Sequence, residues 1–225
     1  MNLFITGIGT NVGKTIVSAI LTEALQADYW KPIQSGTIEG RDSETVTSLI
    51  SNSKTVIHPE TYLLKKPLSP HFAAKLDGLT IELSKIHSQY INLSFSLRAP
   101  RSTTGRESRS DVQHLIIEGA GGLLVPINNN EYVIDIAKKI DCEIVLVISS
   151  YLGCINHTLL SIEYLKRNNF KIYALVFNGE FDFEVKQSIL EYTLNPLIID
   201  IPTLSNLSKQ LISEISMKVK RQITL

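Results

Sequence analysis

Residues 2–15 read Asn-Leu-Phe-Ile-Thr-Gly-Ile-Gly-Thr-Asn-Val-Gly-Lys-Thr, an apolar run that leads into a glycine-rich segment. A buried strand would deliver the chain to a turn whose backbone N–H groups can surround a phosphate. Lys14 would place a positive charge near the β- and γ-phosphates, and the Thr15 hydroxyl could bind Mg²⁺. Apolar residues recur at helical spacing from Ile16 to Leu25, so we expect a helix there. The segment therefore predicts a phosphate-binding loop of the P-loop type.

The spacing of the glycines differs from that of the usual P-loop, in which four residues separate the two glycines. Here five residues lie between Gly7 and Gly13, and three lie between Gly9 and Gly13. An ordinary strand–turn–helix connection is the alternative interpretation. Gly-Lys-Thr stands where the helix must begin, and this position favours the phosphate loop.

Short apolar runs alternate with helical patterns along the rest of the chain. We predict strands at 3–6, 114–117, 144–149, 172–177 and 197–199, a weaker strand at 29–33, and helices near 14–26, 42–51, 80–92, 132–140, 155–168, 184–193 and 206–220. Continuous apolar runs are typical of parallel strands that are covered on both faces. The expected fold is therefore a single α/β domain of the P-loop NTPase type, a doubly wound parallel sheet with helices on both faces. Ligands of such a sheet bind at the carboxyl ends of its strands.

Length and composition agree with one enzyme-sized domain over residues 1–225. Lys plus Arg and Asp plus Glu both number 22, so the net charge is near zero and a general nucleic-acid binder is not expected. Cys142 and Cys154 have neither the spacing of a disulfide framework nor that of a metal finger. We expect no signal peptide and no membrane span, and the default compartment is the cytoplasm.

Residues 94–113 do not follow the alternating pattern. They contain Arg98, Arg101, Arg106 and Arg109 among serines and threonines, with little apolar periodicity. We expect an exposed loop or insertion here. An anion-binding arm is the functional alternative, and a solvated insertion is the more common use of such a composition.

Three charged residues outside the phosphate loop could complete a site for phosphoryl transfer. Glu118 ends a predicted strand before a glycine turn, the place where a carboxylate of P-loop enzymes lies beside Mg²⁺. Lys31 is expected at the carboxyl end of a strand adjacent to the strand of the phosphate loop, where it could neutralise an anionic acceptor. Asp42 opens a helical pattern, either as its N-cap or as a second metal carboxylate. Taken alone, Glu118 could be a simple strand-end acid and Lys31 a surface charge.

Five short motifs occur in a fixed order along the chain. They are Gly-x-x-Thr-x-Val-Gly-Lys-Thr at 7–15, Lys-Pro-x-x-Ser-Gly at 31–36, Ser-Pro-His at 69–71, Glu-Gly-Ala-Gly-Gly at 118–122 and Gly-Cys-Ile-Asn-His at 153–157. In this order they resemble the dethiobiotin synthetase family, and the resemblance runs from Phe4 to about Leu204. The phosphate loop of that family shares the irregular glycine spacing.

The resemblance implies a ligase of biotin biosynthesis. It implies that MgATP drives the carboxylation of 7,8-diaminopelargonate by CO₂ and its closure to dethiobiotin, with release of ADP and phosphate. It also implies a homodimer whose substrate lies at the subunit interface. Lys31 and Lys14 would be catalytic, and Thr15, Asp42 and Glu118 would hold Mg²⁺.

The resemblance implies the binding residues as well. ATP would be bound by Asn11, Val12, Gly13, Lys14, Thr15, Asp42, Glu118, Gly119, Ala120, Gly121, Asn178, Pro202, Thr203 and Leu204, with Asn178 at the edge of the adenine. Diaminopelargonate would be bound by Thr10, Ser35, Gly153, Cys154, Ile155 and Asn156, the last four from the partner subunit. The turn at 153–156 opens a helix, and helix N-termini favour anions such as a carboxylate.

This chain departs from the family at three places. The segment before His114 is longer than in the family by roughly a dozen residues, an insertion that a surface loop could tolerate. Asn11 stands where the family often has Glu, which removes a negative charge beside the phosphates. The region after Asn178 is shortened, and the substrate-contacting tyrosine of the family has no counterpart that can be assigned there.

Three other functions fit parts of the pattern. A non-catalytic nucleotide-binding module would not need Lys14, Thr15, Lys31 and Glu118 together. An amidase acting on a corrinoid would need a glutamine-handling domain, for which no room remains. A partition-type ATPase would have an additional lysine early in the loop, where this chain has Ile8 and Gly9.

Overall fold

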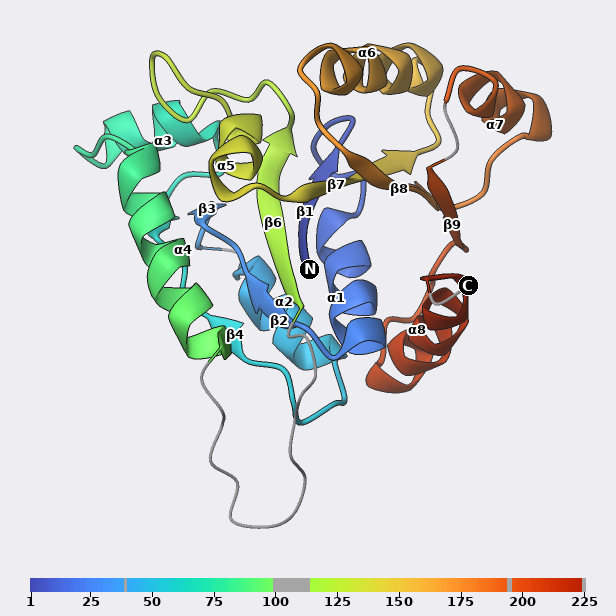
Figure 1. The fold of residues 1–225 in the computed structure, drawn as a ribbon, viewed down its shortest axis with the longest axis horizontal. Helices are drawn as coiled ribbons and strands as arrows, with labels where there is room; N and C mark the ends of the chain where they lie inside the picture. Colours follow the sequence, from blue (N-terminus) through green and yellow to red (C-terminus); the bar gives the residue numbers. More distant parts are fainter. Residues whose placement is uncertain (39, 99–113, 194–195, 224–225) are drawn as a thin grey trace.

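A seven-stranded parallel sheet forms the centre of the computed structural model, which describes residues 1–38, 40–98, 114–193 and 196–223 (Figure 1). In spatial order its strands are β4 (Ile57–His58), β2 (Asp28–Trp30), β6 (Leu115–Gly122), β1 (Asn2–Gly7), β7 (Glu143–Ser149), β8 (Ile172–Asn178) and β9 (Leu197–Ile201). Helices cover both faces of the sheet. The prediction of a doubly wound α/β sheet is confirmed.

The described helices are α1 (Lys14–Leu25), α2 (Asp42–Leu49), α3 (Pro70–Leu76), α4 (Leu83–Arg98), α5 (Val133–Ile140), α6 (Cys154–Arg167), α7 (Phe183–Leu190) and α8 (Lys209–Ile223). Figure 1 shows α1 and α8 on one side of the sheet and α5 and α6 on the other. None of the described helices is both long and apolar enough to cross a membrane.

The apolar run of β1 is continuous because both of its faces are buried. Leu3 and Ile5 pack into the cluster that contains α1 and α8, whereas Phe4 packs into the cluster that contains α4 and α5. Side chains alternate between the two faces of a strand, so a centrally placed strand needs apolar residues at every position.

The weaker strand predicted at 29–33 is in fact two strands that belong to different sheets. β2 ends at Trp30 in the main sheet, and β3 (Ile33–Ser35) pairs with β5 (Tyr62–Leu64) in a separate two-stranded sheet. The break falls at Pro32, which has no N–H group to donate to a strand ladder. The break leaves Lys31 at the carboxyl end of β2. The prediction that its strand is adjacent to the strand of the phosphate loop is wrong, because β6 lies between β2 and β1.

The predicted loop at 94–113 is wrong over residues 94–98, because α4 extends to Arg98. Leu93 packs against the core. This contact lies beyond residue 92, where the sequence pattern predicted the end of the helix. The rest of that prediction, residues 99–113, lies outside the described residues. The single domain over 1–225 therefore stays a prediction.

Candidate functional site

The phosphate loop lies between the ends of three central strands. β1 leads into it and is flanked by β6 on one side and β7 on the other. Ile5 of β1 is in register with Glu118 of β6, and Trp30 of β2 is in register with Ile117 of β6. This parallel register brings residues 8–15, Lys31 and Glu118 to one edge of the sheet, as predicted from the sequence.

The phosphate loop is closed by its own lysine. Lys14 is 7% exposed, and its Nζ donates a hydrogen bond to the backbone O of Gly9 at 2.8 Å. Burial lowers the pKa of Lys14 to about 8, against the attraction of the Glu118 carboxylate. A phosphate in the loop would give this ammonium an anionic partner in place of a carbonyl.

A left-handed glycine joins the loop to α1. Gly13 has φ +93°, and a Cβ atom added to it would lie 2.1 Å from Nδ2 of Asn178. The same Nδ2 donates to the backbone O of Val12 at 3.0 Å. Only glycine can combine this backbone conformation with so close a neighbour. Asn178 thus holds the loop from the end of β8.

Glu118 is the centre of the site. Its side chain is 1% exposed, and its Oε1 accepts hydrogen bonds from Thr15 Oγ1 at 3.0 Å and from Lys31 Nζ at 2.9 Å. Its Oε2 accepts a hydrogen bond from the Tyr29 hydroxyl at 2.8 Å. Glu118 is therefore part of a buried polar network and not a simple strand-end acid.

Lys31 is not a surface charge, since it is 4% exposed. Its ammonium forms ion pairs with both Glu118 and Asp42. Burial by itself would lower the pKa of Lys31, but the two carboxylates raise it overall above its ordinary value. Lys31 is thus a fixed positive charge beside the phosphate loop.

The oxygen atoms around the Lys31 ammonium fit Mg²⁺. The hydroxyl of Thr15 and the carboxylates of Asp42 and Glu118 are hard donors, and the ammonium shows that these carboxylates can balance a cation. Among the described residues, no group of three or more His, Cys, Asp or Glu side chains could hold a metal ion.

Two further predicted residues adjoin this edge of the sheet. Ser35 ends β3, and its Oγ is buried without a hydrogen-bond partner in the structure. Such a hydroxyl is suited to bind a ligand. The glycine turn predicted after Glu118 is wrong, because β6 continues to Gly122, which pairs with Gly7 of β1. Gly121 of β6 has φ +73°, and a Cβ atom added to it would lie 3.6 Å from Oγ1 of Thr10. Residues 119–121 therefore border the phosphate loop.

The turn at 153–156 begins α6, with Gly153 at φ +103° as its N-cap. The Cys154 side chain is buried, and its N–H donates to the backbone O of Tyr151 at 3.0 Å. Neither its thiol nor its N–H is thus open to a ligand. The first-turn N–H groups of Ile155 and Asn156 are the ones suited to an anion, and Asn156 is exposed.

The residues predicted around adenine come together at the ends of β8 and β9. Asn178 is in register with Ile201, and the N–H of Gly179 donates to the Ile201 O at 2.8 Å. Residues 202–204 follow directly; the first two are exposed, and Leu204 packs against the core.

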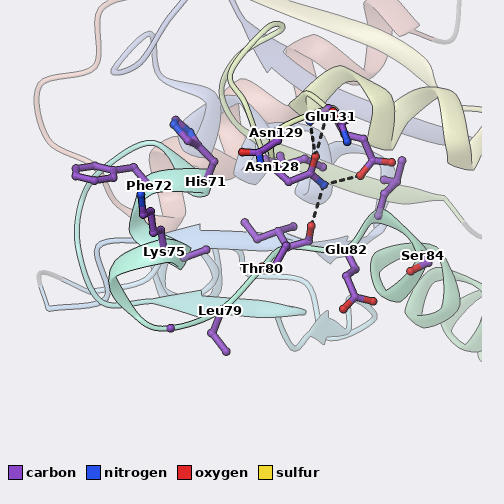
Figure 2. A pocket seen from close by; sticks show the side chains of 16 residues that line it. His71, Phe72, Lys75, Leu79, Thr80, Glu82, Ser84, Asn128, Asn129 and Glu131 are labelled. Atoms are coloured by element: carbon purple, nitrogen blue, oxygen red, sulfur yellow. Dashed lines mark hydrogen bonds between the residues drawn. The ribbon is translucent and has the colours of Figure 1, made fainter.

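A separate groove of about 940 Å³ lies between α3, the segment 78–84 and the loop 127–131 (Figure 2). Asn128 joins two sides of this groove, because its Nδ2 donates hydrogen bonds to the Ile81 O at 2.9 Å and to Glu131 Oε2 at 2.6 Å. His71 of the Ser-Pro-His motif lines this groove, and its N–H donates to the Pro126 O at 3.2 Å. None of the predicted site residues lines it.

Tyr29 was not predicted as part of the site. The signal was present, since residues two apart on a strand share a face, and Tyr29 precedes Lys31 by two positions. Gln34 was also missed; its Oε1 accepts a hydrogen bond from the Asp42 N–H at 3.1 Å and ties α2 to β3.

Comparisons with known proteins agree with this geometry. A family model described as an AAA domain matches residues 1–210. The ATP-dependent dethiobiotin synthetase BioD of Cytophaga hutchinsonii is 41% identical over 216 residues, which cover 96% of this chain and 95% of the relative. The protein of the same name from Christiangramia forsetii is 46% identical over 79% of this chain and 75% of its own.

Solved structures show the same fold at low identity. The MinC:MinD cell division protein complex of Aquifex aeolicus gives a TM-score of 0.56 at 12% identity, covering 99% of this chain and 95% of that one. A ParA family ATPase of Chlorobium tepidum gives 0.52 at 11% identity, covering 99% and 91%.

Proposed function

Because this chain belongs to the dethiobiotin synthetase family, we propose that it converts 7,8-diaminopelargonate, CO₂ and MgATP to dethiobiotin, ADP and phosphate. The observation that carries the proposal is the buried Lys31 ammonium, held by Glu118 and Asp42 beside a phosphate loop. A nucleotide-binding module without catalysis has no use for this charge. We further propose that the protein acts in the cytoplasm as a homodimer.

The reaction needs positioning and charge neutralisation more than a strong base. One amine of the substrate adds to CO₂ and loses a proton to give a carbamate. A carbamate oxygen attacks the γ-phosphorus, and the bond from that phosphorus to the β,γ-bridging oxygen of ATP breaks. The second amine then attacks the carbamoyl carbon, closes the cyclic urea and expels phosphate. Lys14 would neutralise the β- and γ-phosphates, and Lys31 would face the carbamate and the γ-phosphate.

Mg²⁺ would supply charge neutralisation at the β- and γ-phosphates when it is bound, held by Thr15, Asp42 and Glu118. In the structure the Lys31 ammonium occupies the space between the two carboxylates. From this position the Lys31 ammonium would face the γ-phosphate and the carbamate.

We propose the remaining contacts as the resemblance to the family implies them. Ser35 and Thr10 would bind the amino end of diaminopelargonate beside Lys31, and the backbone of 11–13 and 119–121 would surround the phosphates. Asn178 and residues 202–204 would border the adenine. The N–H groups of Ile155 and Asn156 would receive the carboxylate of a substrate bound in the partner subunit.

ATP turnover by the purified protein should require diaminopelargonate and bicarbonate together, because the carbamate is the phosphoryl acceptor. ADP release is measured with each substrate omitted in turn. We expect background release in both omissions. Equal ADP release without the diamine would identify a plain ATPase and overturn the proposal.

A further inference from the structure

We propose that Tyr29 is a positioning residue for the metal–nucleotide: its hydroxyl fixes the rotation of the Glu118 carboxylate. This inference rests on the proposed function, since it assumes that Glu118 helps to hold Mg²⁺. Tyr29 does not touch the substrate in this account. It acts through the orientation of another side chain.

The two oxygens of Glu118 have different partners. Oε1 faces the ligand side, where Thr15 and Lys31 donate to it. Oε2 points to the interior, where the Tyr29 hydroxyl donates to it at 2.8 Å. Tyr29 is 0% exposed and Glu118 is 1% exposed, so this hydrogen bond is closed off from solvent.

The sheet fixes the position of the Tyr29 ring. Tyr29 lies in β2 beside β6, in register with Ile116, and its ring belongs to the cluster that contains α1. Tyr29 and Lys31 are two residues apart, and both side chains reach Glu118. The ring therefore presents its hydroxyl from a rigid, fully packed position.

Three donors to Glu118 lie in the part of the chain that the structure describes, and two of them, Thr15 and Lys31, are themselves proposed to bind the metal–nucleotide. Both would have to redirect their donated hydrogens when it enters. Tyr29 has no such second role, so its hydrogen bond can persist when the metal–nucleotide binds. It would keep Oε1 turned toward the ligand when the other two donors leave. Removal of a hydrogen-bond partner that orients a metal ligand commonly lowers the affinity for the metal about 10–100-fold.

Tyr29→Phe keeps the ring in the core and removes the hydroxyl. The test measures the affinity for AMP-PNP by isothermal titration calorimetry at a series of Mg²⁺ concentrations. We expect the Mg²⁺ concentration that gives half of the full gain in AMP-PNP affinity to rise about 10-fold in this variant. We expect the affinity for AMP-PNP without Mg²⁺ to change less than twofold, because Tyr29 does not contact the phosphate loop in this account.

Tyr62→Phe is the matched control. Tyr62 is also buried, and its hydroxyl accepts a hydrogen bond from the Glu82 N–H at 3.0 Å. The Tyr62→Phe variant loses a phenol hydroxyl that does not contact Glu118. This change should leave the Mg²⁺ titration unchanged. An equal shift in both variants would mean that Tyr29 acts through general stability, which overturns the inference.

A Glu118→Gln background provides the second test. If Tyr29 acts through the Glu118 carboxylate, Tyr29→Phe should shift the Mg²⁺ titration less than twofold when residue 118 is already glutamine. The same 10-fold shift in both backgrounds would overturn the inference. A Tyr29→Phe titration equal to that of wild type would also overturn the inference, but it would leave the proposed function intact. If AMP-PNP binding by wild type does not depend on Mg²⁺, the proposed metal site itself fails, and this inference fails with it.

Discussion

Lys31→Ala should lower kcat about 10²–10³-fold, because it removes a preplaced positive charge from the site of the developing anion. The affinity for ATP should stay within threefold of wild type, since Lys14 and the loop backbone bind the phosphates. The two effects are separated by steady-state ADP release with both co-substrates present and by calorimetric titration with ATP.

Lys139→Ala is the control for Lys31→Ala, because Lys139 is an exposed lysine at the end of α5. It should leave both kcat and ATP affinity unchanged. A Lys31→Ala enzyme whose kcat lies within threefold of wild type would show that the buried ammonium serves the fold and not the reaction.

A mixture of two inactive variants, Lys31→Ala and Asn156→Asp, should regain activity. Asn156→Asp would place a negative charge beside the carboxylate of the substrate, and like charges at that range repel. If the site is shared, a heterodimer of the two variants keeps one site that carries neither change. Random exchange in equal amounts would then restore about a quarter of the wild-type activity, since half of the dimers hold one intact site of two.

Subunit exchange must be shown independently, for example by native mass spectrometry of the mixture. Each variant alone should stay inactive under the same conditions. If heterodimers form and no activity returns, Lys31 and Asn156 act in the same chain, and the shared site is wrong.

The centre of the fold was predictable because its strands are buried on both faces. That burial produces the continuous apolar runs of β1, β7 and β8, which are typical of parallel strands covered on both faces. The strands β4 and β5 are only two and three residues long, too short to form such a pattern. Likewise α3 has seven residues and gives no helical periodicity that could be distinguished from a loop.

The candidate site was predictable where chemistry and topology coincide. Lys14 and Thr15 follow β1 through the loop, Lys31 follows β2, and Glu118 lies within β6. Parallel strands bring their carboxyl ends to one edge of the sheet. The hydrogen bond from Tyr29 was not predicted, because a tyrosine in an apolar strand is ordinarily core. Its role depends on the register of β2 against β6, which a single sequence does not reveal.

The fate of carbon from bicarbonate decides whether this site makes dethiobiotin. Purified protein is incubated with MgATP, diaminopelargonate and ¹³C-bicarbonate, and the organic product is analysed by mass spectrometry. We predict dethiobiotin that carries the label in its cyclic urea, formed in step with ADP. ADP formation without a labelled ring product would contradict the assignment of this site to dethiobiotin synthesis.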